Sequence, residues 1–221
     1  MDSDQSRIRR DSDRYFARNR SRLWSPLDRV LESVETIHES FGLQRVLELG
    51  CADGGRLDVI RRRFGCDVVG LEASEQAVST GRRIHSGVEI HAGVAPDALE
   101  EFTTEGSFDL IIVGFLMYVL PRSRLFQLAA GVDRLLAIDG HVVIHDFLFP
   151  VNSTRDYAHD ASLMTFKTNP SDAWTWSPNY VLVDRNVYRG QANSDRRDPD
   201  HWVTVDVARK VDDEVTYPNL S

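Results

Sequence analysis

The stretch Val-Leu-Glu-Leu-Gly-Cys-Ala-Asp-Gly-Gly-Arg-Leu, residues 46–57, decides the fold of this chain. It begins as a short apolar run that carries one acid, Glu48, and continues as a loop of glycines and small residues that opens into a helical pattern. Such a loop brings the backbone close to a ligand at the carboxyl end of a strand. A second acid, Glu72, ends the next apolar run, residues 68–71. Two acids on successive strand ends, on either side of a glycine loop, suit a ligand with an amino group and a free ribose.

The composition is typical of one globular domain. The chain has 221 residues, 42% of them hydrophobic, and no linker marks a second domain. No apolar run approaches the roughly 18 residues that span a bilayer, and residues 1–22 have no apolar signal core. The chain has two cysteines, which belong to no recognisable motif, and this favours a reducing cytoplasm. Arginine far outnumbers lysine, as in proteins of GC-rich bacterial genomes. A net charge of −8 argues against broad nucleic-acid binding.

Apolar and helical patterns alternate along the chain from residue 45 onward. Several of the apolar runs are continuous, as expected for strands with both sheet faces covered by helices. Ser74 stands where the N-cap of the second helix would be. The alternation predicts a doubly wound, mostly parallel α/β sheet with right-handed crossovers. The predicted strands are residues 45–50, 67–72, 88–91, 108–114 and 141–147, and the predicted crossover segments are residues 57–64, 75–84, 96–102 and 122–138.

The C-terminal third has a different pattern. Residues 152–173 are polar and poorly periodic, with scattered aromatics, whereas residues 180–188 and 202–210 alternate as strands do. These two runs predict an antiparallel pair at one end of the sheet, which brings the predicted sheet to seven strands. Before the first strand, residues 27–41 have a helical pattern, with a further helix expected upstream of them.

The glycine loop has two interpretations. Read as G-x-A-x-x-G, residues 50–55 approximate a dinucleotide-binding fingerprint, with Glu72 about where a ribose-binding acid belongs. Glu48 argues against that interpretation, because a carboxylate beside the loop would repel a pyrophosphate. S-adenosylmethionine (SAM) carries no phosphate, and its ammonium group favours a nearby acid. An NAD-linked dehydrogenase or reductase and a non-catalytic binding module remain the alternatives.

Residues 45 to about 147 resemble the class I, Rossmann-like SAM-dependent methyltransferases of small-molecule type. Residues 48–54 stand where this family has E-x-G-x-G-x-G, with Ala52 in place of the middle glycine, a change that costs little if its backbone angles are ordinary. The closing antiparallel strand pair also matches the family's sheet. The resemblance implies SAM as the cofactor, without a metal. It implies that these residues bind SAM: Glu48, Gly50, Cys51, Ala52, Gly54, Glu72, Ala73, Val94, Ala95, Val113, Gly114 and Phe115.

The same resemblance implies a division of the chain into three segments and a set of candidate catalytic residues. Residues 1–42 are expected to form a helical lid, residues 43–150 the cofactor-binding core, and residues 151–221 the acceptor side with the terminal strand pair. Catalysis in such enzymes is mostly placement of the nucleophile in line with the methyl–sulfur bond, at about 3–3.5 Å. His145 and Asp146 end the fifth predicted strand, and Tyr118 follows the fourth. His145 is favoured as a base because an unperturbed histidine pKa lies nearest neutrality. A hydrogen-bonded histidine and a helix-capping Asp146 are the alternatives, and Asp146 as a ligand in a catechol-type metal site is a further one, for which the sequence offers no matching acidic pair.

The acceptor is expected to be a small molecule, methylated on oxygen or nitrogen. Aromatic-rich segments after the fifth strand commonly build the acceptor pocket, and the N-terminal helix adds one candidate. No motif for nucleic acid follows the fourth strand, no membrane contact is expected, and the protein is expected to be a monomer or a homodimer. The predicted acceptor-side residues are Tyr15, Tyr157, Lys167, Trp176 and Tyr180.

Overall fold

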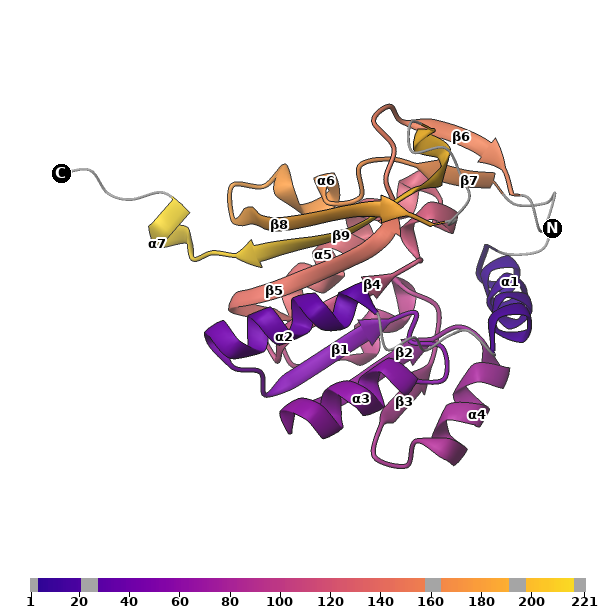
Figure 1. Cartoon of the computed structure of the whole chain (residues 1–221), viewed down its shortest axis with the longest axis horizontal. Coiled ribbons are helices and arrows are strands. Elements are labelled where there is room, and N and C mark those ends of the chain that lie inside the picture. The colour runs from indigo at the N-terminus through magenta and orange to yellow at the C-terminus, as the bar shows by residue number, and fades with distance from the viewer. Residues whose placement is uncertain (1–3, 21–27, 158–163, 191–197, 217–221) are drawn as a thin grey trace.

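The computed structural model describes residues 4–20, 28–157, 164–190 and 198–216 (Figure 1). Its centre is a seven-stranded sheet in the order β3-β2-β1-β4-β5-β9-β8. The first five strands of that order are parallel, β9 runs antiparallel to β5, and β8 runs antiparallel to β9. The strands are β1 (Arg45–Leu49), β2 (Asp67–Glu72), β3 (Glu89–Ala92), β4 (Phe108–Gly114), β5 (Leu136–Phe147), β8 (Tyr180–Arg189) and β9 (Trp202–Lys210). The predicted fold class, with its closing antiparallel pair, is confirmed.

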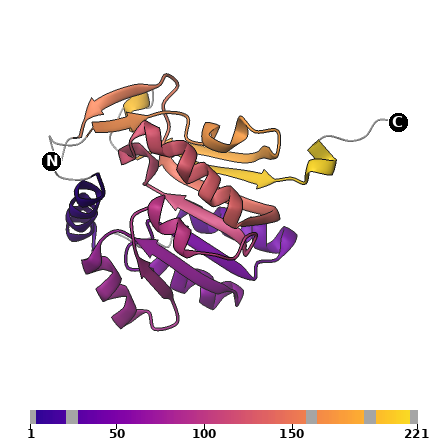
Figure 2. The same cartoon turned by 180° about the vertical axis from the view of Figure 1, so that it is seen from behind.

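Helices cover both faces of the sheet. On β1, Val46 packs with the residues of the helices on one face, and its neighbour Leu47 packs with those on the other. Figure 1 views the face that carries α2 and α3, and Figure 2 views the face that carries α5. Both faces are buried, which is why the strand sequences are continuously apolar. The long helices are α1 (Asp4–Asn19), α2 (Arg29–Phe41), α3 (Gly55–Phe64), α4 (Glu75–Ile84) and α5 (Leu125–Leu135). Ser74 caps α4 as predicted, accepting from the Ala77 amide at 3.1 Å.

The predicted helix over residues 122–138 ends earlier than expected. After a 3₁₀ turn, η3 (Arg122–Arg124), helix α5 stops at Leu135, and the chain enters β5 directly. Leu136 pairs with Phe108, whereas His141 already pairs with Leu110, so the extra residues form a bulge. Asp139 in this bulge has φ 65°. Residues 139–140, which lie between the predicted helix and the predicted strand, are therefore inside the strand.

The segment after β5 is more regular than its sequence indicates. It forms a two-stranded antiparallel sheet of β6 (Ser153–Asp156) and β7 (Met164–Lys167), followed by the short helix α6 (Asp172–Thr175). The two strands are short and largely polar, so they leave no alternating apolar signal for a sequence-based prediction. The remaining short helices are η1 (Asp97–Glu101), η2 (Met117–Val119), η4 (Pro199–His201) and α7 (Asp213–Thr216).

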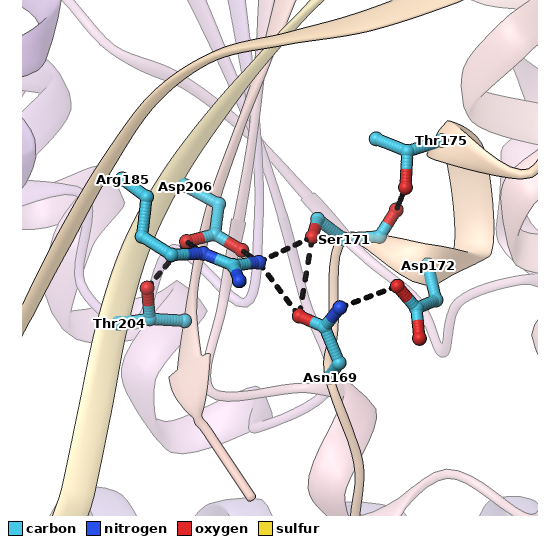
Figure 3. Close-up of polar contacts among 7 residues, drawn as sticks. All are labelled: Asn169, Ser171, Asp172, Thr175, Arg185, Thr204 and Asp206. Atoms are coloured by element: carbon cyan, nitrogen blue, oxygen red, sulfur yellow. Dashed lines mark hydrogen bonds and ion pairs between the residues drawn. The ribbon is translucent and has the colours of Figure 1, made fainter. Parts of the chain in front are cut away.

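An ion pair ties this segment to the closing strand pair (Figure 3). Arg185 on β8 donates to both carboxylate oxygens of the fully buried Asp206 on β9, at 2.9 and 2.6 Å. The same guanidinium donates to Ser171 Oγ at 2.7 Å and to Asn169 Oδ1 at 2.6 Å. A bidentate guanidinium–carboxylate pair is geometrically specific, so this network fixes the start of α6 against β8 and β9.

Candidate functional site

A cavity of about 350 Å³ lies at the carboxyl ends of β1, β2, β4 and β5, against α1. Its size falls in the range of small-molecule sites, and strand carboxyl ends are where ligands bind in doubly wound sheets. Its lining comprises Ile8, Asp11, Ser12, Tyr15, Phe16 and Asn19 of α1; Asp28, Arg29 and Arg56 at helix starts; and, from the strand ends and loops, Glu48, Gly50, Ala52, Leu71, Glu72, Ala73, Gly93, Val94, Ala95, Gly114, Phe115, Leu116, Tyr118, Val119, His145 and Tyr188.

The glycine loop brings backbone directly against the cavity. Gly50 has φ 78°, and a Cβ on it would lie 2.9 Å from the carbonyl oxygen of Gly114. Ala52 also adopts a left-handed conformation, with φ 50°. Its backbone angles are therefore not ordinary, so the condition under which alanine would cost little is not met, and a left-handed residue with a Cβ is strained by about 1–2 kcal/mol.

Glu72 closes the loop from the end of β2. Its two carboxylate oxygens accept hydrogen bonds from the amides of Ala52 and Ser74, at 2.8 and 2.7 Å. The side chain is only 7% exposed, and burial raises its pKa while the backbone donors oppose that rise. A carboxylate has about four lone-pair positions, so two amide donors leave capacity for a ligand hydroxyl pair. Glu72 is thus held in place and lines the cavity, as the sequence predicts for a ribose-binding acid.

Glu48 does not stand alone in the cavity. Arg56, in the first turn of α3, donates to Glu48 Oε1 and also, from Nε, to Asp28 Oδ2 at 2.7 Å. The second oxygen of Glu48 is buried and has no hydrogen-bond partner among the described residues. Burial raises the pKa of Glu48 and Arg56 opposes that rise; the two adjoining carboxylates in turn raise the pKa of Arg56. A cation between two acids, rather than a single acid, therefore forms this wall.

His145 ends β5 beside the cavity, but its ring nitrogens are not free. Nε2 lies 2.5 Å from the hydroxyl of Tyr188, and Nδ1 is buried without a partner among the described residues. The ring of Phe115 packs on it, with centroids 4.4 Å apart. Burial, and secondly the charge of Arg56, lower the pKa of His145 to about 3. The reason for favouring it as a base, a pKa near neutrality, is therefore wrong, and the structure fits the hydrogen-bonded alternative.

The buried neutral imidazole gives an acid-sensitive contribution to stability. Unfolding restores an ordinary histidine pKa of about 6.5, so below that pH the unfolded chain binds a proton that the folded chain does not. The free energy of unfolding therefore decreases as the pH falls from about 6.5 toward 3, by about 2 kcal/mol from His145 at pH 5 relative to pH 7.5. Urea denaturation at pH 7.5 and pH 5 measures the decrease in the free energy of unfolding between the two pH values. In His145→Gln this decrease should be smaller than in the wild-type protein by about 2 kcal/mol. Equal losses in both proteins would contradict a neutral, buried ring.

Of the other two predicted catalytic residues, Tyr118 lines the cavity and Asp146 does not. Asp146 is 1% exposed, does not line the cavity, and accepts from the amides of Met117 and Phe147 at 2.8 and 2.7 Å. Adjacent strand residues point to opposite sides, so Asp146 caps η2 while His145 reaches the cavity. Tyr118 does line the cavity. Its ring packs against Phe147 and Tyr157, at centroid distances of 5.1 and 6.0 Å.

The predicted acceptor-side residues are not brought together. Tyr15 lines the cavity, while Tyr157 lies behind Tyr118 and accepts from Arg18 at 3.4 Å. Lys167 lies over the rings of Phe147 and Phe149 and does not line the cavity.

Trp176 and Tyr180 do not line the cavity. Trp176 is 69% exposed and packs on Phe126 of α5, and the hydroxyl of Tyr180 donates to Asp133 at 2.8 Å. For Tyr180 the reason is strand direction: β8 is antiparallel to β9, which is antiparallel to β5, so β8 starts far from the cavity and ends beside it. The residue of β8 that reaches the cavity is Tyr188, which the sequence reasoning missed.

Of the predicted cofactor residues, three do not line the cavity. Cys51 is buried in the core beside Gly70, Gly54 faces Ile90 and Val88, and Val113 is part of the core on the α5 face. Asp28, Arg29 and Arg56 line the cavity without having been predicted. For Arg56 a signal existed, because it occupies the first helical turn after a glycine loop, where side chains border the ligand.

Helix α1 lies across the cavity and contacts residues at the edge of the cavity. Ser74 Oγ donates to Asp13 Oδ1 at 2.5 Å, and Phe16, 1% exposed, packs with Ala52 and Ala77. In both views α1 lies beside α4 at the carboxyl ends of the strands. No described helix is long and apolar enough to cross a membrane. Within the described ranges, no group of three or more His, Cys, Asp or Glu side chains is placed to hold a metal ion.

The sheet order, the glycine loop and the buried acid at the end of β2 are together those of the class I methyltransferase fold. Residues 46–140 match the family model described as a methyltransferase domain. An uncharacterized methyltransferase of Synechocystis sp. (strain ATCC 27184 / PCC 6803 / Kazusa) is 30% identical over 109 residues, 49% of this chain and 50% of the relative. The chain thus spans about half the length of the curated relative that it matches.

Solved structures share the fold over most of the chain. The 1,6-didemethyltoxoflavin-N1-methyltransferase of Burkholderia thailandensis, solved with S-adenosylhomocysteine (SAH), has a TM-score of 0.68 and 16% identity, covering 96% of this chain and 91% of its own. CalS10, an amino pentose methyltransferase of Micromonospora echinaspora solved with SAM, gives 0.62 and 18%, covering 89% and 96%. The N-methyltransferase NodS of Bradyrhizobium japonicum WM9, solved with SAH, gives 0.61 and 17%, covering 91% and 99%. At these identities the likeness shows the fold alone.

Proposed function

We propose that this chain transfers the methyl group of SAM to a nitrogen or oxygen of a small molecule by in-line displacement. The observation that carries the proposal is Glu72, a buried carboxylate fixed by two loop amides at the edge of a ligand-sized cavity. That arrangement fits a ribose with two free hydroxyls and needs no phosphate. The three solved structures contain SAM or SAH, and two of those proteins methylate a named small molecule, 1,6-didemethyltoxoflavin or an amino pentose, which supports the same activity.

The cavity fits the other parts of SAM as well. The buried, unpartnered oxygen of Glu48 would accept from the ligand's ammonium, and Arg56 beside it would meet the carboxylate. Gly50 and Gly114 both line the cavity and carry no side chain that would fill the space needed by the chain between ribose and sulfur. Ala73, Val94 and Ala95 offer an apolar slot for adenine. When bound, SAM supplies an electrophilic methyl group on a sulfonium, and the chain's residues position what it reacts with.

The rest of the site follows from this orientation. Phe115, Tyr118 and His145 line the cavity at the ends of β4 and β5, where the methyl group would lie. We assign residues 1–42, with α1, to a lid, residues 43–150 to the cofactor-binding core, and residues 151–221 to the acceptor side. The buried free thiols of Cys51 and Cys66 and the bacterial relatives support a bacterial cytoplasmic enzyme.

Isothermal titration calorimetry tests the proposal directly. SAM and SAH are expected to bind one per chain with a Kd on the order of 1–100 µM, the range of ordinary enzyme–substrate affinities. NAD, which carries a pyrophosphate that the carboxylate of Glu48 beside the glycine loop would repel, is expected to give no heat. Binding of NAD without SAM would replace the proposal with the dehydrogenase alternative, and binding of neither ligand would refute it.

A further inference from the structure

The end of β8 brings a tyrosine to the acceptor side of the cavity. Tyr188 pairs with Val203 on β9, two residues before Val205, which pairs with His145 on β5. This register brings the Tyr188 hydroxyl within 2.5 Å of His145 Nε2. Tyr188 lines the cavity and is half-buried. Two strands distant in sequence thus place a hydroxyl in front of the histidine at the end of β5.

The hydroxyl of Tyr188 is the polar group that this pair presents. Nε2 of His145 is used by Tyr188, and Nδ1 is covered by protein atoms. A tyrosine hydroxyl has one donor and two acceptor positions. When it donates to Nε2, a lone pair of its oxygen remains for a ligand, and the imidazole behind it fixes the direction of that lone pair.

The surroundings keep both members of the pair uncharged. Burial and the nearby carboxylate of Asp28 raise the pKa of Tyr188 to about 12, and the pKa of His145 lies far below neutrality. The guanidinium of Arg29 lies 4.7 Å from the centre of the Tyr188 ring and donates to Asn186 at 3.2 Å, which holds the ring from its outer side. A neutral hydroxyl and a neutral imidazole can orient a ligand but do not remove its proton.

We propose that Tyr188 contacts the methyl acceptor and accepts a hydrogen bond from its N–H, with His145 as the positioning residue behind it, and that the acceptor atom is a neutral amine nitrogen. This inference rests on the proposed function and narrows its acceptor from nitrogen or oxygen to nitrogen. An alcohol would need a base, but each of the four carboxylates that line the cavity is already engaged. Asp28 and Glu48 pair with Arg56, Glu72 accepts from the amides of Ala52 and Ser74, and Asp11 on α1 has a polar or charged contact of its own.

The reaction then balances without a protein base. The lone pair of the amine attacks the methyl carbon, the carbon–nitrogen bond forms, and the carbon–sulfur bond breaks. Its electron pair stays on sulfur, which turns the sulfonium into the neutral thioether of SAH. The nitrogen becomes an ammonium that keeps its proton, with one N–H on Tyr188, and it loses the proton to water after release.

Sinefungin tests this inference without knowledge of the acceptor. This SAM analogue carries an amino group on a carbon that replaces the methylated sulfur, so the amine takes the place of the transferred methyl group and its N–H groups point toward the acceptor side. We expect the wild-type protein to bind sinefungin about tenfold more tightly than SAH, the effect of one hydrogen bond to a charged donor. In Tyr188→Phe the ratio of the Kd of SAH to the Kd of sinefungin should fall from about ten to about one. The Kd of SAH itself should stay within about twofold of the wild-type value.

Matched variants separate positioning from general damage. His145→Leu should lose the preference for sinefungin, because nothing then holds the hydroxyl, whereas His145→Gln should keep it through an amide oxygen that accepts from Tyr188. Tyr180→Phe removes a hydroxyl at the far end of the same strand, where it binds Asp133, and should leave the ratio unchanged. A wild-type ratio near one, or an unchanged ratio in Tyr188→Phe, overturns the inference. Failure of SAH itself to bind overturns the proposed function instead.

Discussion

Glu72→Ala is expected to weaken the binding of SAM at least about a hundredfold, the largest effect on affinity of any single change in the cavity. Hydrogen bonds to a charged group are worth about 1.5–3 kcal/mol each, and a ribose would lose two of them. The change also leaves the amides of Ala52 and Ser74 without their carboxylate partner. Because the hydrogen bond from the Ala52 amide holds the glycine loop to the end of β2, the loop's fit to the ligand is lost together with the ribose contact.

Calorimetry with SAM and SAH measures this loss of affinity, and two further variants serve as controls. Glu72→Gln keeps the shape but turns an amide donor toward one of the backbone N–H groups, so an intermediate loss of about tenfold is expected. Glu75→Ala removes a carboxylate that lies three residues further on and is 81% exposed, and it should change the Kd less than twofold, as an exposed charge contributes little. Wild-type affinity in Glu72→Ala would show that the ribose lies elsewhere.

The sequence predicts those parts of the site that depend on strand ends close together along the chain. The loop after β1 and the acid at the end of β2 are joined by one short helix, and parallel strands bring both to the same edge of the sheet. Glycine spacing and apolar runs are local signals, so β2, β4, α4 and β9 have the predicted bounds. The fold class follows from their order alone.

Other parts of the site depend on partners that the sequence does not record. Which end of β8 meets the cavity depends on the order and direction of three strands, so Tyr180 and Tyr188 look equally suitable until β8 is paired. The pairing of Glu48 with Arg56 and the low pKa of His145 arise from side-chain packing and burial. An aromatic-rich stretch does not distinguish a surface tryptophan such as Trp176 from a pocket residue. Local pattern therefore locates the cofactor side better than the acceptor side.

Arg56→Met is expected to lower the free energy of unfolding by about 3–5 kcal/mol, because removing one member of a buried ion pair leaves uncompensated buried charge. The Glu48 side chain is fully buried and that of Asp28 is 10% exposed, with the 11% exposed guanidinium between them. Methionine fills a similar volume without the charge, so the loss reports electrostatics more than a cavity. Guanidinium chloride denaturation measures it, with Arg62→Met, 68% exposed and paired with Asp58, as a control expected to lose less than about 1 kcal/mol.

The pH dependence and a second substitution identify the cause of that loss. Without Arg56, burial raises the pKa of Glu48 further, so the folded state takes up a proton at a higher pH than the unfolded chain does. Stability is then gained as the pH falls toward the unfolded pKa, and the deficit of Arg56→Met should be smaller at pH 5 than at pH 8. Adding Glu48→Gln to Arg56→Met should recover part of the loss, because one buried charge no longer needs a partner. A deficit that is independent of pH and of Glu48 would mean that Arg56 stabilises the fold by packing alone, and that the cavity wall does not depend on its charge.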